Sequence, residues 1–344
     1  MRIKNTLFML LAILLAANLT LFGEQDETAS DYIPIIPLLD AELIGLDIAH
    51  SYLGFNIGFL GLNKVRGTFN TYDMAFLYNE KDLTQLSFTL VIDAASIDTR
   101  MEMRDKDLRG ERFFEVEKYP NIIFQSNRIE KNADGFIAHG NLTMRGVTKA
   151  IAVPFTQTVQ RTKDPGWQNI RIGFEGRISL NRKDYGVNGG NFWGNRALSD
   201  EVEIEFTILG NKFNLEKFGF ARGDIPSIGK PLWEAVLADD GKAALKKYHE
   251  LKANQPDDYN FKMRDIGLVG KRLMYRGDID SALEFLNIVL AEEPEDKGHH
   301  LALGEAYALK SDRAKAIEHF RKAQELDPND PWAMEMLRQL ERKK

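Results

Sequence analysis

Alternating apolar and polar residues dominate the first two thirds of the chain. Between residues 201 and 209, Val202, Ile204, Phe206 and Ile208 alternate with three glutamates and a threonine, which is the period of a strand with one buried face. Polar turns and glycines separate similar stretches with no long helix between them. The pattern predicts eight strands, at residues 52–60, 65–76, 86–92, 122–129, 136–144, 150–159, 170–180 and 201–209. Such a series is typical of an antiparallel meander that closes into a barrel and so loses its sheet edges.

A different pattern interrupts the predicted barrel at residues 93–126. Met101, Met103 and Leu108 lie among charged residues at roughly helical spacing, and Phe113 and Phe114 follow them. A short amphipathic helix in this stretch would lay its apolar side on an open barrel end. We therefore expect a lid helix that Phe113 and Phe114 complete.

The inward side of the predicted strands is rich in phenylalanine. An eight-stranded barrel is just wide enough either to be filled by side chains or to hold one small ligand. Any single ring is more often core filling than a ligand contact, so a ligand site rests on the whole set. The predicted lining comprises Phe55, Ile57, Phe59, Phe69, Phe88, Leu90, Phe124, Phe155 and Phe174.

A helical period replaces the alternation after residues 212–230, a linker with several glycines and a proline. Small, aromatic and proline residues recur there at the offsets of the 34-residue tetratricopeptide repeat, a helix-turn-helix unit. The best copy has Gly304, Tyr307, Ala316, Phe320, Ala323 and Pro328, and the preceding copy has Gly270, Leu273, Ala282, Leu286, Val289 and Pro294. A partial third copy has Ala244, Tyr248, Leu251 and Pro256.

Each repeat leaves an apolar face uncovered, so the array needs about three repeats and a cap. Asp330 and Pro331 predict the start of a final helix, in which Met334, Leu337 and Leu340 face inward. We expect this helix to be a solvating cap. A groove for a protein or peptide partner is the function that the resemblance to tetratricopeptide repeats implies.

The first part of the chain resembles the YceI family of lipocalin-like, polyisoprenoid-binding proteins. The resemblance rests on SIDT, RDKDLRG and FFEVEKYPNIIF, supported by IAHSYLGFNIGFLGLNKVRGTF, GNLTMRGVTKAIAVPF, LNRKDYGV and SDEVEIEF, and spans residues 46–209. It implies a secreted or periplasmic barrel that buries a long isoprenoid tail, as in a polyprenyl quinone or alcohol. His50 matches the family's N-terminal histidine-serine pair, which implies a packed or ligand-contacting role.

The loop at residues 186–194 is rich in glycine and carries Phe192 and Trp193. Exposed aromatic residues on such a loop could touch a membrane transiently or gate the barrel mouth. We favour Trp193 as a plug that folds back into the barrel.

The sequence gives little indication of a catalytic site or a metal-binding site. His50 and Ser51 are adjacent on a strand and point to opposite faces, so they cannot form a nucleophile and its base. Asp98, Glu102, Asp105 and Asp107 are interleaved with basic residues, which is typical of a solvated helix face. His299 and His300 lack a third ligand at useful spacing, and no catalytic fingerprint occurs. We expect no enzyme and no cofactor beyond a bound polyisoprenoid.

Charge and the N-terminal residues limit the compartment and the partners. A net charge of -6 gives no basic face for the phosphate backbone of nucleic acid. Residues 1–23 have two basic residues and then an apolar run, and acidic residues follow at positions 24–27, which is the layout of a secretory signal. An uncleaved membrane anchor is the alternative. The absence of cysteine excludes disulfides and a lipoprotein anchor.

The sequence thus predicts an antiparallel eight-stranded lipocalin-like barrel with a short lid helix at 40–211, followed by an all-α repeat domain at 231–344. We expect an exported protein that holds a polyisoprenoid and binds a protein partner. A scaffold with a filled barrel is the first alternative, and an enzyme acting on a buried isoprenoid lipid is the second.

Overall fold

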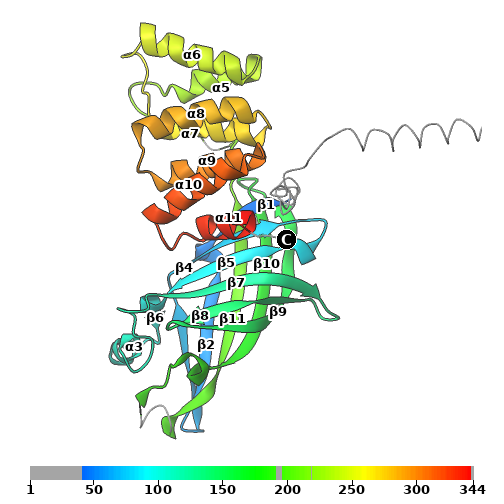
Figure 1. Cartoon of the computed structure of the whole chain (residues 1–344), viewed down its shortest axis with the longest axis vertical. Coiled ribbons are helices and arrows are strands. Elements are labelled where there is room, and N and C mark those ends of the chain that lie inside the picture. The colour runs from blue at the N-terminus through cyan, green and yellow to red at the C-terminus, as the bar shows by residue number, and fades with distance from the viewer. Residues whose placement is uncertain (1–40, 191–195, 218, 342–344) are drawn as a thin grey trace, which may run out of the picture. The chain divides into compact units, whose positions relative to one another are not determined.

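The computed structural model describes residues 41–190, 196–217 and 219–341 (Figure 1). The predicted signal at residues 1–23 and the loop residues Phe192 and Trp193 lie outside the described residues. Among the helices within those ranges, none is long and apolar enough to cross a membrane.

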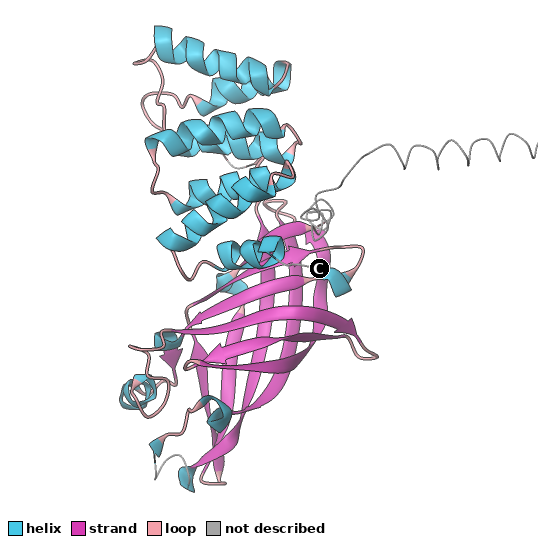
Figure 2. Cartoon of the chain, in the orientation of Figure 1, coloured by secondary structure: helices cyan, strands magenta, loops and turns pink. Residues whose placement is uncertain are grey.

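The first part of the chain is one antiparallel sheet that closes on itself (Figure 2). The ring runs β1-β4-β5-β7-β8-β9-β10-β11, and β11 pairs back to β1. The strands are β1 (Glu42–Leu46), β2 (Tyr52–Phe59), β3 (Asn63–Phe69), β4 (Tyr72–Tyr78), β5 (Ser87–Asp93), β6 (Ile97–Asp98), β7 (Asn121–Lys131), β8 (Phe136–Met144), β9 (Val147–Lys163), β10 (Ile170–Asn181) and β11 (Leu198–Lys212). The predicted eight-stranded closed barrel is confirmed.

At three of the eight positions around the barrel, two short strands take the place of one long strand. β1 and β2 both pair with β11, so they occupy one position, and the 3-10 turn η1 (Ile48–His50) separates them. At the next position around the ring, β4 pairs with β1 and β3 pairs with β2. At the position after that, β5 pairs with β4 and β6 pairs with β3. The stretch predicted as one strand at 65–76 is therefore two strands.

Local sequence explains several of the connections. Arg145 and Gly146 both have positive φ angles, 49° and 73°, between β8 and β9, as a two-residue hairpin of type I′ requires. Asp82, Asp93 and Asn181 cap the 3-10 turns η2 (Leu83–Gln85), η3 (Ala94–Ser96) and η4 (Arg182–Tyr185) by accepting hydrogen bonds from backbone N–H groups. β1 was not predicted from the sequence, because the first predicted strand begins at residue 52.

The lid helix and the repeat helices are also present. The described helices are α3 (Glu102–Arg109), α5 (Gly229–Ala238), α6 (Gly241–Asn254), α7 (Met263–Tyr275), α8 (Ile279–Glu292), α9 (Lys297–Leu309), α10 (Arg313–Leu326) and α11 (Pro331–Glu341). α5 to α10 form three antiparallel pairs, as the repeat spacing predicts. A Cβ atom on Gly304 would lie 2.8 Å from the ring of Phe320, which explains the small residue at this helix crossing.

The expectation of a solvating cap is wrong for α11. Met336, Leu337 and Leu340 pack inward as part of a cluster that also contains Leu77 of β4, and Glu335 is fully buried. Glu335 accepts hydrogen bonds from Ser87 and Thr89 on β5. The outer side of α11 therefore lies on barrel strands, and the repeat helices and the barrel share an interface.

Candidate functional site

The barrel encloses a cavity with two sections. The wide section has a volume of about 840 Å³ and lies between α3, η4 and the inner faces of β2, β3 and β11. The narrow section has a volume of about 140 Å³ and lies deeper, among β4, β5, β7, β8, β10 and β11. Phe69, Met144, Leu180 and Ile204 line both sections. The two sections are therefore adjacent, with these four side chains forming a shared wall.

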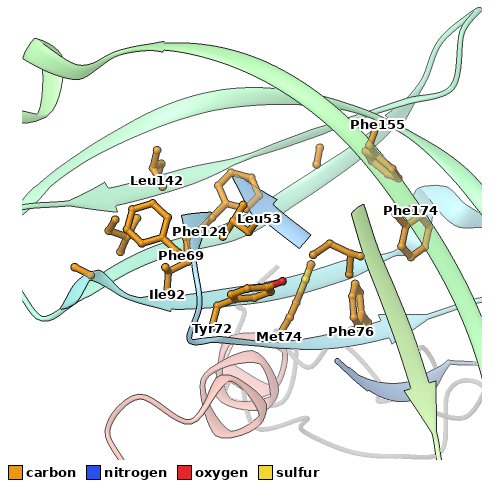
Figure 3. Packing of buried hydrophobic residues seen from close by; sticks show 14 of the residues in the cluster. Leu53, Phe69, Tyr72, Met74, Phe76, Ile92, Phe124, Leu142, Phe155 and Phe174 are labelled. Carbon is orange, nitrogen blue, oxygen red and sulfur yellow. The ribbon is translucent and has the colours of Figure 1, made fainter. Parts of the chain in front are cut away.

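Aromatic rings line the narrow section, among them Phe76, Phe124, Phe155 and Phe174 (Figure 3). The ring of Phe88 lies 5.6 Å from that of Phe124 and 6.2 Å from that of Phe76, and Phe76 lies 6.0 Å from Phe174. Phe174 meets Phe155 edge-on at 5.7 Å. These spacings are favourable for aromatic pairs. The narrow section is thus a mostly filled aromatic passage with a small residual volume.

Polarity differs sharply between the two sections. The narrow section is lined by apolar side chains and Gly54 alone, whereas the wide section adds charged and hydroxyl groups near α3. Those groups are Thr99, Arg104, Lys106, Asp107, Arg112, Arg182 and Tyr185. An amphipathic ligand would therefore place its tail in the narrow section and its polar end near α3.

The lid helix α3 is held by hydrogen bonds on one side. Arg104 donates to the hydroxyl and the carbonyl of Thr99, each at 2.7 Å, and Arg109 donates to the carbonyls of Ala95 and Ile97. Asp105 is buried and accepts a hydrogen bond from the N–H of Thr99 at 2.9 Å. The interpretation of Asp105 as part of a solvated face is therefore wrong, because its carboxylate anchors the start of the helix.

The aromatic residues of the lid follow the helix instead of belonging to it. Phe113 is 4% exposed, and Phe114 meets the ring of Phe69 edge-on at 5.9 Å. Met101 and Met103, expected on the apolar side of the helix, are 48% and 76% exposed although some of their atoms line the wide section. The two phenylalanines thus cover the cavity more closely than α3 does.

Arg145 connects the segments around this end of the barrel. It lies in the hairpin between β8 and β9 and donates to the carbonyls of Glu111 and Gly186 and to the carboxylate of Glu115. The N–H of Gly189 donates to the carbonyl of Arg112 at 2.8 Å. These contacts join the segment after α3 to the segment after η4.

Two buried polar groups lie beside the wide section. Arg182 is 5% exposed and donates to the carbonyls of Val187, Asn188 and Ser199. Tyr185 is 2% exposed, and its hydroxyl has no hydrogen-bond partner within the described part of the chain. Burial raises the pKa of Tyr185, so this hydroxyl keeps its proton at neutral pH.

The structure places the predicted site residues in three groups. Phe55, Ile57, Phe59, Phe113 and Phe114 line the wide section, Phe88, Leu90, Phe124, Phe155 and Phe174 line the narrow section, and Phe69 lines both. Trp193 lies outside the described residues. The packed role expected of His50 is wrong, because its side chain is 69% exposed in η1 and contacts Asp47 at 3.0 Å.

Several lining residues were not predicted from the sequence. Met74 and Phe76 line the narrow section from β4, and Leu180, Arg182 and Tyr185 line the wide section from the end of β10 and from η4. The alternation of side chains along residues 72–78 could have predicted that Met74 and Phe76 face inward. The position of η4 under the lid depends on tertiary contacts, so local sequence carried no signal for Arg182 and Tyr185.

One group of candidate metal ligands lies far from the cavity. Single ligand atoms of Glu293, Asp296 and His299 lie within 4.8 Å of one another. Asp296 also caps α9 by accepting a hydrogen bond from the N–H of His299 at 3.0 Å. Helix capping accounts for this arrangement.

Family comparisons match both parts of the chain. A profile of the YceI-like domain matches residues 45–209, and a tetratricopeptide repeat profile matches residues 270–331. A UPF0312 protein of Yersinia pestis is 37% identical over 161 residues, which cover 47% of this chain and 81% of the relative. A UPF0312 protein of Yersinia enterocolitica shows the same identity and coverage.

Solved structures also resemble the barrel part. BcnA of Burkholderia cenocepacia is 24% identical with a TM-score of 0.42, over 48% of this chain and 98% of that protein. A YCEI protein of Campylobacter jejuni is 25% identical with a TM-score of 0.40, over 48% of this chain and 96% of that protein.

Proposed function

Since this chain belongs to the YceI-like family, we propose that its barrel holds an isoprenoid lipid of the quinone or polyprenol type. The observation that carries the proposal is the pair of adjacent sections inside the barrel, of which the narrow one is apolar throughout and the wide one has about 840 Å³. Small-molecule sites in proteins commonly have about 300–1,000 Å³. The wide section is therefore large enough for a lipid.

The energetics favour recognition through the tail. Burial of one CH₂ group contributes about 0.8 kcal/mol, so one isoprene unit contributes roughly 3 kcal/mol before the costs of association and ordering. A net hydrogen bond contributes only about 1 kcal/mol. The chain of isoprene units therefore supplies most of the affinity, and polar groups near α3 adjust the preference among head groups.

The filled-barrel scaffold is the second candidate, and one observation favours it in part. The narrow section keeps only about 140 Å³, comparable to an engineered apolar cavity that binds one benzene molecule. A filled barrel would also need side chains throughout the wide section, where about 840 Å³ is open. We therefore prefer the lipid-binding function.

The remaining elements of the proposal concern location and partner. The N-terminal residues have the layout of a secretory signal, which supports function outside the cytoplasm. The three helix pairs α5 to α10 support binding of a protein or peptide partner through the repeats. No catalytic step is proposed.

Mass spectrometry of an organic extract tests the lipid proposal. The full-length protein is purified from its native source without detergent, extracted, and compared with an unrelated protein purified alongside it. We expect a polyisoprenoid in a ratio near one lipid per barrel. An extract without isoprenoid, together with no binding of added menaquinone or polyprenol, would show that the filled-barrel scaffold is correct.

A further inference from the structure

A pocket on the outside of the barrel shares part of its wall with the narrow section. This outer pocket has a volume of about 470 Å³ and is formed by residues of β8, β9, β10 and β11 and of the turn before β8. Phe155 of β9 and Phe206 of β11 line both the outer pocket and the narrow section. Two side chains therefore separate the interior of the barrel from its outer surface at this point.

The backbone ladder ends at the same place. β9 and β10 pair from Lys163 and Ile170 as far as Phe155 and Gly176. The residue of β9 beyond this point is Pro154, which has no N–H group to continue a ladder. β10 runs on to Asn181 paired with β11, so β9 and β10 separate here.

Gly176 leaves room for the ring that closes the gap. A Cβ atom at Gly176 would lie 2.5 Å from the ring of Phe206 and 2.5 Å from the carbonyl oxygen of Pro154. The ring of Phe206 therefore occupies space that a side chain at position 176 would fill. Side-chain packing, and not a row of backbone hydrogen bonds, closes this part of the wall.

The two rings can move without loss of backbone hydrogen bonds. Phe155 stacks on Phe136 at 5.6 Å, on the outer-pocket side, and meets Phe174 edge-on at 5.7 Å, on the cavity side. Phe206 is half-buried. Each aromatic contact contributes only about 0.5–1.5 kcal/mol beyond burial, so a rotation that exchanges these contacts for contacts with a ligand costs little.

We propose that Phe155 and Phe206 form a lateral portal, through which the far end of a long linear isoprenoid chain passes from the narrow section into the outer pocket. The proposal rests on the proposed lipid-binding function and adds a second subsite to it. The polar end of the lipid stays near α3, and the tail leaves the barrel between β9 and β10.

Volume and surface chemistry support a tail subsite. The narrow section, at about 140 Å³, holds roughly one benzene-sized group, which is about one isoprene unit. Phe136, Pro154, Phe155 and Phe206 supply apolar contacts in the outer pocket. Its other lining residues are polar or glycine, and they include Asp134, Glu175 and the pair Arg177 and Glu205, whose side chains lie 3.0 Å apart. Three acidic residues against one basic residue disfavour an anionic head group here, whereas the four apolar residues can contact a hydrocarbon chain.

Binding of isoprenoids of two lengths to the full-length protein tests the portal. The probes are menaquinones with four and with eight isoprene units, which share one head group. Thr156→Trp fills the outer pocket from an exposed position of β9, and Thr158→Trp, at the next exposed position of that strand and outside the pocket, is the matched control. We expect T156W to weaken binding of the longer menaquinone at least tenfold and to leave the shorter one unchanged, whereas T158W changes neither.

Photocrosslinking gives an independent readout. A benzophenone amino acid at position 156 should crosslink to the longer menaquinone and not to the shorter one, and the same group at position 158 should crosslink to neither. Equal effects of T156W on both probes, or the absence of a length-dependent crosslink, would overturn the portal while leaving lipid binding intact. Failure of both menaquinones to bind the unaltered protein would overturn the portal together with the lipid function itself.

Discussion

The carboxylate of Glu335, on α11, accepts a hydrogen bond of 2.8 Å from the hydroxyl of Thr89, on β5, across 246 residues of sequence. Both residues are fully buried. Arg338 donates three hydrogen bonds to the same carboxylate and a fourth to the carbonyl of Ser126 on β7. The side chains of Phe88 and Leu90, which flank Thr89 on β5, line the narrow section from the other side of the sheet.

Removal of the Glu335 carboxylate should destabilise the protein strongly. Glu335→Ala leaves the guanidinium of Arg338 without its carboxylate at a buried site, and such losses cost about 3–5 kcal/mol. Glu341→Gln is the control, because its partner Arg321 is 63% exposed and surface pairs contribute about 0–1 kcal/mol. Urea denaturation followed by circular dichroism measures both changes, and equal effects of the two variants would contradict a role for the buried pair.

The barrel and the repeats should stabilise each other as separate fragments. We expect a fragment of residues 31–211 to fold as β structure, because the barrel closes on itself, but to melt at a lower temperature than the barrel in the full chain. The fragment of residues 224–344 added in trans should raise that temperature, since it covers Leu77, Ser87 and Thr89. Differential scanning calorimetry measures the shift, and the same helical fragment with Glu335→Ala should produce none.

Filling the wide section should reduce lipid binding without loss of the fold. Val202 lines the wide section from β11, and its neighbour Glu201 is exposed. If the Trp side chain of V202W displaces one isoprene unit, the binding free energy weakens by roughly 3 kcal/mol, which raises Kd about a hundredfold. Glu201→Trp should leave binding unchanged. Quenching of intrinsic fluorescence by added menaquinone measures Kd, and a V202W protein that binds normally would place the ligand elsewhere.

Loosening the cover over the cavity should speed lipid release. Phe114→Ala removes the edge-on contact with Phe69, so we expect faster transfer of a fluorescent isoprenoid to acceptor vesicles. Phe113→Ala is less informative, because Phe113 is 4% exposed and the loss of a buried ring costs about 3–5 kcal/mol of stability. Leu62→Ala, at a position that is 85% exposed and outside the cavity lining, is the control. Unchanged transfer rates in a folded F114A protein would make this segment purely structural.

His319 should make the stability of the repeats depend on pH. Burial lowers the pKa of its imidazole below the usual 6.5, and the nearby His300 lowers it further. Above pH 6.5 both the folded and the unfolded forms are neutral and the full stability is present. As the pH falls below 6.5 the unfolded form binds the proton first, so the free energy of unfolding decreases.

The variant His319→Phe isolates this effect. Phenylalanine can keep the stacking on Tyr307, whose ring lies 5.4 Å from that of His319, and it does not titrate. Urea denaturation at pH 7.5 and at pH 5.5 measures the change, and the unaltered protein should lose more stability between these values than H319F does. Parallel losses in the two proteins would assign the pH dependence to other groups.

Local sequence determined the two architectures, because both depend on short periods. The inward parity of Phe55, Phe88 and Phe124 follows from the alternation of side chains along a strand, and the structure places all three beside the cavity. The helix pairs follow from a spacing that repeats along the chain, as at Gly270 and Gly304. Each of these inferences needs only neighbours in sequence.

Only the tertiary structure decided how these parts meet. The burial of Asp105 depends on Thr99 lying above the first turn of α3, the exposure of His50 depends on a break between β1 and β2, and the burial of Glu335 depends on strands some 250 residues earlier. From the sequence alone, a charged residue is expected to be exposed to solvent. Its hydrogen-bonding partners in the folded protein can lie far away in the sequence, so local spacing does not reveal them. The closing of the barrel wall by Phe155 and Phe206, where β9 and β10 separate, is a feature of the same kind, since strand pairing over long distances sets it.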